Sequence, residues 1–335
     1  MGHESFWVIV LLILLALTFD FLNGFHDAAN SIATIVSTGV LRPNQAVAFA
    51  AFFNLFALLI FPLTVAATIG KGIINPGIVD SHVIFGALVG SIFWNLITWF
   101  YGIPSSSSHA LIGGLIGASL SKVGLSSLLW PGIFKTIIFI FISPLLGFLL
   151  GSIIMVIVAH LFKNQALAST DKTFRNLQLL SSGIYSIGHG GNDSQKTIGI
   201  IWLILISGGY VSSTSSTPGY WVILICYFAI ALGTLCGGWR IVRTMGGRLT
   251  KLKPVGGFCA ETGGAVTLFI ATGLGIPVST THTITGAIIG VGSTQHMSGV
   301  RWGLAQNIVW AWIITIPAAG IVASLGYFFS SLLFK

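Results

Sequence analysis

The sequence predicts an all-α polytopic membrane protein with two inverted repeats, each containing a broken helix and a Ser/Thr-tipped re-entrant hairpin. Of its 335 residues, 54% are hydrophobic and only 7% are charged, whereas a soluble domain is about one-quarter charged. Apolar segments of bilayer-crossing length, about 20 residues, recur along the whole chain. Two kinds of polar segment each occur twice, once in each half of the chain.

The clearest repeat is a proline followed by hydroxyl residues and a histidine. Residues 104–109 read Pro-Ser-Ser-Ser-Ser-His, and residues 277–282 read Pro-Val-Ser-Thr-Thr-His. A proline and a Ser/Thr residue before an apolar run mark the start of a helix. The free N–H groups at that start, the positive end of the helix dipole and the hydroxyls together suit an anion. One copy alone would be an ordinary capped helix, but two copies in an apolar chain favour a site.

The second repeated feature is a polar interruption inside a long apolar stretch. Residues 5–38 contain Asp20-Phe-Leu-Asn23-Gly24-Phe-His26-Asp27-Ala-Ala-Asn30-Ser31, and residues 177–206 contain Gly188-His189-Gly190-Gly191-Asn192-Asp193-Ser194-Gln195-Lys196. Irregular polar backbone at membrane depth is tolerated only where it lines protein or a water-filled cavity. We therefore expect a broken helix in each half.

The other apolar stretches follow the same order in both halves. The expected spans are 44–69, 83–101, 109–120, 132–162, 220–239, 255–276 and 302–334. Segments 83–120 and 255–292 could each be a re-entrant hairpin or two full spans. Hairpins are favoured, because hydroxyl tips that meet at the membrane midplane would explain both polar runs. The domains are then an N-terminal repeat, a cytoplasmic linker and a C-terminal repeat, at residues 1–162, 163–176 and 177–335.

Basic residues set the expected orientation. The 240–253 loop carries five Lys/Arg residues and should be cytoplasmic, whereas the 207–219 loop carries none and should lie outside. Counting crossings in both directions places both termini outside, which makes the two halves inverted. The protein is expected in the plasma (inner) membrane, and its positive charge is explained by these loops rather than by nucleic-acid binding.

Carboxylates within apolar segments are candidate functional groups, because an intramembrane charge is costly. Asp27 and Asp193 occupy matching positions in the two halves. Together with the nearby carboxamides they offer oxygen ligands that suit a hard cation. A structural alternative is that Asp193 pairs with Lys196, three residues on, along one helix face. Asp20 has either a water-facing or interfacial role or a place in the site, and Glu261 also falls in an apolar segment.

Four histidines lie beside the polar segments, and the sequence leaves two roles open for them. His26, His109, His189 and His282 either pack with hydrogen-bonded partners or support the site and relay protons. They do not form a recognisable zinc ligand set. A site that offers both cation ligands and an anion cradle is suited to cotransport, because bound cations would neutralise the carboxylates that otherwise repel the anion.

These segments resemble the motifs of the PiT family of inorganic phosphate transporters. Residues 24–31 are similar to the family pattern Gly-x-Asn-Asp-x-Ala-Asn, and residues 190–199 are similar to its second copy. Both hydroxyl runs are similar to the family's paired hairpin tips. His26 stands where many members have Asn, and Gln195-Lys196 stand where many have Ala-Asn. Both departures resemble low-affinity bacterial members, which are described as proton-coupled and able to carry a metal-phosphate complex.

The resemblance implies symport of phosphate with H⁺ or Na⁺, without another cofactor and often as a homodimer. It assigns phosphate to the hydroxyls Ser106, Ser107, Ser108, Ser279, Thr280 and Thr281. It assigns the coupling cation to Asn23, Asp27, Asn30, Asn192 and Asp193, with Na⁺ at Asp27 and Asp193. Further candidates at the site are Ser105, His26, His109, Gln195, Lys196, Glu261 and His282.

Two other function classes compete with symport. A passive oxyanion channel would be obstructed by the embedded carboxylates unless cations travel too. An intramembrane serine hydrolase needs one nucleophile, whereas this chain has two matching hydroxyl runs without a Gly-x-Ser setting. We therefore expect a transporter and not an enzyme. The sequence leaves open whether Na⁺ or H⁺ is the coupling ion and whether the substrate is phosphate, metal-phosphate or arsenate. It also leaves open the affinity and the oligomeric state.

Overall fold

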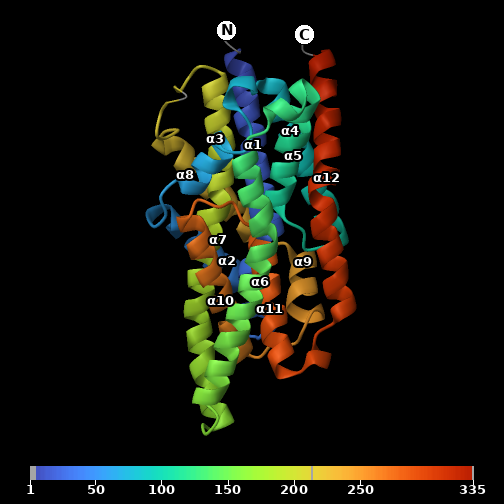
Figure 1. Cartoon of the computed structure of the whole chain (residues 1–335). Helices are drawn as coiled ribbons and strands as arrows, with labels where there is room; N and C mark the ends of the chain where they lie inside the picture. Colours follow the sequence, from blue (N-terminus) through green and yellow to red (C-terminus); the bar gives the residue numbers. More distant parts are fainter. Residues whose placement is uncertain (1–4, 213, 334–335) are drawn as a thin grey trace.

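A computed structural model describes residues 5–212 and 214–333, whose regular structure is helical (Figure 1). The α-helices are α1 Phe6–Ser37, α2 Pro43–Phe56, α3 Thr64–Lys71, α4 Ser81–Tyr101, α5 Ser107–Val123, α6 Trp130–Leu161, α7 Leu167–Ser207, α8 Tyr220–Cys236, α9 Trp239–Arg243, α10 Pro254–Gly273, α11 Thr280–Gln295 and α12 Trp302–Leu333. Among the described residues, six helices are long and apolar enough to cross a membrane, or up to eight if each bent pair is one span. The expected all-helical membrane fold is confirmed.

The break that we expected inside each polar segment is wrong. Helices α1 and α7 run without interruption for 32 and 41 residues. Their polar segments contain no proline, so the backbone hydrogen bonds continue and the polar side chains project from an intact helix. The glycines serve close packing instead. A Cβ at Gly24 would lie 2.1 Å from the Ile230 carbonyl oxygen, and one at Gly190 would lie 2.5 Å from that of Asn54.

The bends lie one element later in each half. The chain turns by 82° between α2 with its 3₁₀ extension and α3, and by 58° between α8 and α9. Pro62 lies at the first bend, and Gly237, with φ of +66°, lies at the second. The expected span over 44–69 corresponds to this bent pair of helices. The expected 240–253 loop is partly helical, because α9 continues into a π-helical turn at Thr244–Arg248.

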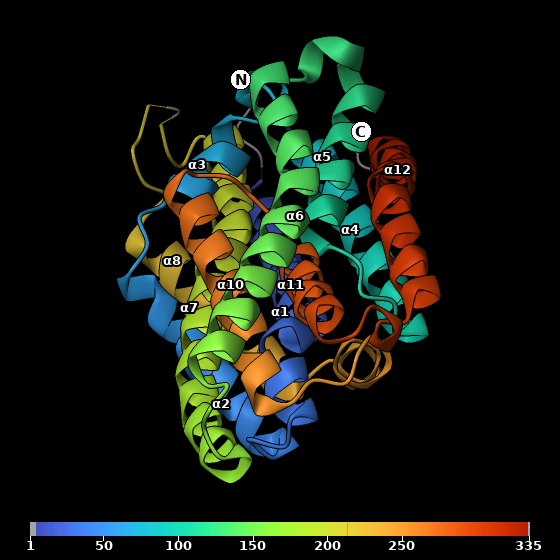
Figure 2. The same cartoon turned by 60° about the horizontal axis from the view of Figure 1, so that its bottom comes forward.

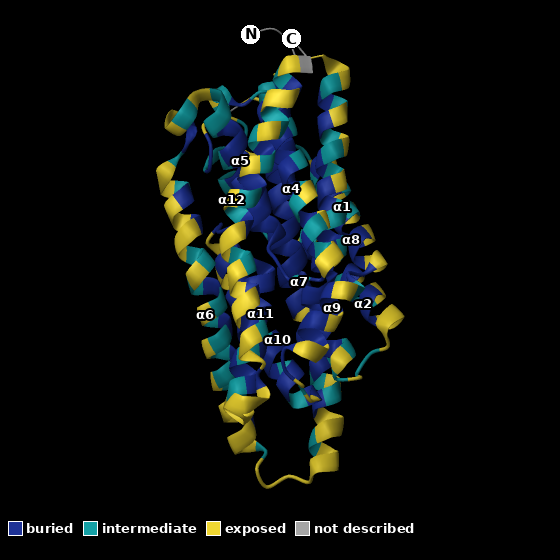
Figure 3. Cartoon of the chain, turned by 90° about the vertical axis from the view of Figure 1, so that its right-hand side faces the viewer, coloured by how far each residue is buried: buried dark blue, intermediate teal, exposed yellow. Residues whose placement is uncertain are grey.

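Two helical hairpins approach the centre from opposite ends of the molecule. The α4/α5 pair occupies the upper half and the α10/α11 pair the lower half in two different views (Figures 1 and 3). Each hairpin turns at a glycine with positive φ, Gly102 at +66° and Gly275 at +67°. The tips meet where the Ser108 hydroxyl donates to the Val278 carbonyl over 3.1 Å.

The predicted helix starts at the tips are confirmed. The Ser106 hydroxyl accepts from the His109 N–H at 3.2 Å, and the Ser279 hydroxyl accepts from the His282 N–H at 3.1 Å. These are N-cap hydrogen bonds at the same position of both repeats. Each cap still carries a hydroxyl proton that can be donated to a ligand.

Each hairpin packs against a long helix from the other half of the sequence. Figure 2 shows α12 beside α4 and α5, and α6 beside α10 and α11. The glycines repeated after each hydroxyl run permit this approach. A Cβ at Gly117 would lie 2.1 Å from the Gly320 carbonyl oxygen, and one at Gly290 would lie 2.3 Å from that of Phe148. Burial is greatest where the tips meet, and the apolar outer faces of α6 and α12 are largely exposed, as lipid-facing surfaces are (Figure 3).

Candidate functional site

One face of α1 carries a continuous polar stripe. Asp20, Asn23, Asp27 and Asn30 recur every three or four residues, which places them on the same side of the helix. Each of them is at most 2% exposed. An intact helix can therefore present these groups to the protein interior without any local unwinding.

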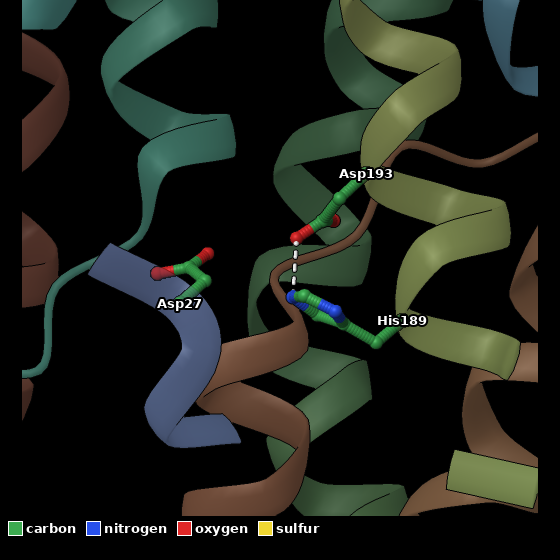
Figure 4. A group of neighbouring side chains, drawn as sticks. All are labelled: Asp27, His189 and Asp193. Carbon is green, nitrogen blue, oxygen red and sulfur yellow. Dashed lines mark ion pairs between the residues drawn. The ribbon is translucent and has the colours of Figure 1, made fainter. Parts of the chain in front are cut away.

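A matching polar stripe on α7, formed by His189, Asp193 and Lys196, faces α1 at the centre of the molecule. Asp27, His189 and Asp193 bring their ligand atoms within 4.8 Å of one another (Figure 4). The juxtaposition of the two aspartates was expected from their matching positions and is confirmed. Figure 4 shows Asp27 on one ribbon and the other two residues on the facing helix, with an ion pair between Asp193 and His189.

Asp27 is bound by its neighbour and by the first hairpin tip. The His26 Nδ1 lies 2.5 Å from Asp27 Oδ1. The Ser107 hydroxyl lies 2.8 Å from Asp27 Oδ2 and 2.6 Å from Asn23 Oδ1, so the two acceptors share this single donor. The first hydroxyl tip thus contacts the carboxylate of its own half.

Asp193 has an equivalent contact with the second tip and an added ion pair. The Thr280 hydroxyl donates to Asp193 Oδ2 at 3.1 Å, and His189 Nε2 lies 3.2 Å from the same oxygen. Lys196 Nζ binds Asp193 Oδ1. The Asp193–Lys196 ion pair, which the sequence analysis gave as a structural alternative, is therefore present, and it lies inside the candidate site.

Each stripe also binds the hairpin tip of the opposite half. The Asn30 amide donates to the hydroxyls of Thr280 and Thr281 at 3.1 and 3.0 Å. The Lys196 ammonium donates to the Ser108 hydroxyl and, at 2.9 Å, to the Val278 carbonyl. Asn30 and Lys196 occupy matching positions of the repeat. The tips are therefore held reciprocally by the two halves.

Three predicted residues hold the tips in place, namely His26, Ser105 and Asn192. His26 Nε2 lies 3.1 Å from the Thr98 hydroxyl, which also accepts from Ser105 at 2.9 Å. Asn192 accepts from the Val278 N–H at 3.3 Å and donates to the Ile276 carbonyl at 3.1 Å. These contacts hold the extended segment of each tip against α1 or α7.

Gln195 lies away from the aspartate pair. Its side-chain oxygen accepts from the N–H groups of Val65 and Ala66 at 2.9 and 3.2 Å, at the start of α3. Gln195 thus satisfies the free N–H groups of a helix that begins at the 82° bend.

The two tip histidines pack against each other across the repeat interface. The ring centroids of His109 and His282 are 4.5 Å apart, and His282 stacks on Trp312 at 3.7 Å. Trp312 donates to the Pro104 carbonyl at 3.0 Å. These rings form the packed side of the tips that faces α12.

Glu261 belongs to a separate polar cluster below the centre. Its carboxylate accepts from the hydroxyls of Thr34 and Ser181, both at 2.6 Å, and from the Gln178 amide at 2.9 Å. Thr34 lies on α1, four residues after Asn30. The α1 stripe therefore continues past the central site to this fully buried carboxylate.

Sequence reasoning placed His189 beside the polar segments but left it out of the cation site. Its other ring nitrogen, Nδ1, lies 3.1 Å from Asn54 Oδ1, and the Asn54 amide donates to Thr234 at 2.9 Å. The signal was available, because His189 matches Asn23 at the spacing that relates Asp27 to Asp193. Asn54 carried no comparable signal.

The central site combines groups that suit a cation with helix ends that suit an anion. Two carboxylates against one ammonium leave a net charge of −1 when both histidines are neutral. Oxygens of Asp27, Asp193, Asn23, Ser107 and Thr280 are the ligands that a hard cation prefers, so the donor set fits Na⁺. The N-termini of α5 and α11 bring positive dipole ends to the same place.

Comparisons with known proteins agree on one protein family. The sequence model of the phosphate transporter family matches residues 23–323. A probable low-affinity inorganic phosphate transporter of Rhizobium meliloti (strain 1021) is 62% identical over 328 residues, covering 98% of both chains. One of the same description from Bacillus subtilis (strain 168) is 43% identical, covering 97% of this chain and 98% of the relative. A solved structure described as the sodium-dependent phosphate transporter has a TM-score of 0.89 at 24% identity, covering 98% of this chain and 100% of that one.

Proposed function

Because this chain belongs to the phosphate transporter family, we propose that it is a secondary active symporter coupling phosphate movement to a gradient of H⁺ or Na⁺. It is a multi-pass membrane protein that transports inorganic phosphate, and it is not an enzyme. The coupling mechanism is the proposed part, and it follows from the charges at the centre of the molecule.

The observation that carries the proposal is the position of Asp27 and Asp193 directly against both hydroxyl tips. With His26 and His189 neutral, the buried site has a net negative charge before any ligand binds, because Lys196 neutralises only one of the two carboxylates. A phosphate anion entering this site is repelled unless a cation binds with it. Coupling thus arises from electrostatics, and the same charge disfavours a passive oxyanion channel.

The proposed phosphate ligands are the six tip hydroxyls with the N-termini of α5 and α11. The hydroxyls of Ser107 and Thr280 now face carboxylates, and a cation bound to those carboxylates would free them to donate to phosphate. Residues assigned to phosphate are Ser106, Ser107, Ser108, Ser279, Thr280 and Thr281, and residues assigned to the cation are Asn23, Asp27, Asn30, Asn192 and Asp193.

The proposal includes the arrangement in the membrane. The halves 1–162 and 177–335 form inverted repeats joined by the cytoplasmic linker 163–176, with both termini outside and both hairpins re-entrant. The opposed hairpins, whose tips touch in the protein centre, support this arrangement (Figure 1). Helix α7 begins at Leu167, inside the linker stretch. A homodimer in the plasma membrane completes the proposal and rests on the family resemblance.

The function is tested by uptake of radiolabelled phosphate into proteoliposomes under separate Na⁺ and proton gradients. We expect accumulation above the external concentration under one of the two gradients, and simple equilibration when neither is imposed. Equilibration without accumulation under both gradients would identify a passive channel.

Loss of one tip hydroxyl should weaken phosphate binding without unfolding the protein. In Ser107→Ala or Thr280→Ala, one charge-assisted hydrogen bond is lost, worth about 1.5–3 kcal/mol or roughly 10- to 150-fold in affinity. The measurement is the phosphate dissociation constant of the purified protein at saturating cation. Ser126→Ala, in an exposed turn, is the control. Wild-type affinity in both tip variants would refute the assignment of phosphate to the tips.

A further inference from the structure

The α1 stripe begins with a carboxylate that the central site does not use. Asp20 lies seven residues before Asp27, two helical turns or roughly 10 Å away along the same face. Its side chain is fully buried, which excludes the water-facing role that the sequence left open.

The polar groups around Asp20 are incompletely paired. Among the described residues, neither carboxylate oxygen of Asp20 has a hydrogen bond of ordinary geometry. Thr197 and Asn23 are the polar side chains placed to donate to Asp20, and the Thr197 hydroxyl and the Asn23 amide nitrogen have no other partner in the same described part of the chain. A buried carboxylate with such incomplete pairing is unfavourable unless a proton or a bound cation neutralises it.

A second pair of polar side chains, Tyr227 and Gln195, lies near Asp20. Tyr227 lies within electrostatic range of Asp20 and has Gln195 as its side-chain neighbour. The Tyr227 hydroxyl and the Gln195 amide nitrogen are likewise without hydrogen-bond partners among residues 5–212 and 214–333. On the inner side, the charges of Asp193 and Lys196 both reach Asp20. Asp20 is thus a neighbour both of Tyr227 and of the charges of the central site.

A pocket borders Tyr227. Its volume is about 260 Å³, and it is lined by the α2–α3 bend together with Thr217, Tyr220, Ile223 and Tyr227. Thr217 and Tyr220 are exposed at the start of α8. The bend that the sequence did not predict therefore forms one wall of the pocket that Tyr227 also lines.

We propose that Asp20, Thr197 and Tyr227 form a second cation station, through which the coupling cation passes from this pocket to Asp27 and Asp193. The station rests on the proposed symport function, since it serves the cation of that cycle. The cation exchanges the oxygens of Asp20 and Thr197 for those of the central site along one helix face. Asn23 borders both positions, because it lies three residues after Asp20 and shares Ser107 with Asp27.

The test replaces Asp20 with Asn in the full-length protein reconstituted into proteoliposomes. The initial rate of phosphate uptake is measured against external Na⁺ at fixed pH, and against external pH without Na⁺. In whichever arm drives the wild type, we expect Asp20→Asn to raise the half-saturating cation concentration at least tenfold. The Na⁺ and proton arms identify which cation the station binds.

A milder variant separates a cation station from a structural role for Asp20. Tyr227→Phe removes only the hydroxyl and should shift the same half-saturating concentration two- to fivefold, with an unchanged thermal unfolding midpoint. Tyr101→Phe, at a side chain 71% exposed, is the matched control and should leave the cation dependence unaltered.

Wild-type cation dependence in Asp20→Asn would overturn the station while leaving the symport proposal intact. If Asp20→Asn does not fold, unaltered cation dependence in Tyr227→Phe would overturn it as well. Failure of the wild-type protein to accumulate phosphate in either arm would instead reject the symport proposal itself, and the station with it.

Discussion

Asp27→Asn is expected to abolish gradient-driven accumulation of phosphate in a protein that remains folded. The amide keeps the size of the side chain and can still accept from the Ser107 hydroxyl, which now lies 2.8 Å from Asp27 Oδ2. It removes the negative charge that attracts the coupling cation. The measurement compares uptake driven by the cation gradient with phosphate-for-phosphate exchange in the same proteoliposomes.

Exchange should persist in Asp27→Asn, because the proposed phosphate ligands, the hydroxyl tips and the helix N-termini, are retained. Asp171→Asn, which neutralises an exposed carboxylate, is the control for loss of negative charge alone. Normal gradient-driven accumulation by Asp27→Asn would contradict a coupling role and would leave Asp27 as a structural partner of His26.

Asp193→Asn should lose transport and also lower stability. Lys196 is 1% exposed, and within the described residues it forms its ion pair with Asp193. Breaking a buried ion pair leaves an uncompensated charge and costs about 3–5 kcal/mol. We expect a lower unfolding temperature in detergent, followed by fluorescence-detected size exclusion on heating.

The double variant Asp193→Asn with Lys196→Asn separates the two effects. It removes both charges and places at position 196 the carboxamide found at the matching Asn30. Thermal stability should recover, whereas gradient-driven uptake should stay absent. An Asp193→Asn protein as stable as wild type would show that Lys196 does not depend on this carboxylate.

Local repetition in the sequence was sufficient to predict the hairpin tips. The helix starts at Ser107 and Thr280, the caps at Ser106 and Ser279, and the meeting of the two aspartates all follow from matching segments. Segments with the same Pro-hydroxyl pattern adopt the same local structure, because caps depend on only a few neighbouring residues.

The helix breaks were misplaced because glycine has two different uses. In the polar segments, Gly24 and Gly190 were interpreted as interruptions, but they allow contact with backbones far away in the sequence. That use depends on tertiary neighbours, which a local pattern does not contain. Pro62 and Gly237–Gly238 mark the true bends, but they lie within or at the end of apolar runs that we interpreted as single spans without a bend being predicted there.

Contacts between distant segments could not be predicted from spacing. Gln195 binds the start of α3, and Asn30 binds a tip some 250 positions later in the chain. Both side chains belong to predicted polar segments, so the sequence identified them as candidates. Only the packing of α1, α3 and α7 decides which of them reaches the central site and which caps a neighbouring helix.

The reciprocal hold on the tips has an energetic consequence for the transport cycle. In an inverted repeat with two identical halves, the outward-facing and inward-facing states would exchange the roles of the halves and have equal free energy. Here an amide holds one tip through Asn30, and an ammonium holds the other through Lys196. In the proposed inverted-repeat cycle, the outward-facing and inward-facing states would therefore differ in free energy even without an ion gradient, because the two holding contacts are chemically different.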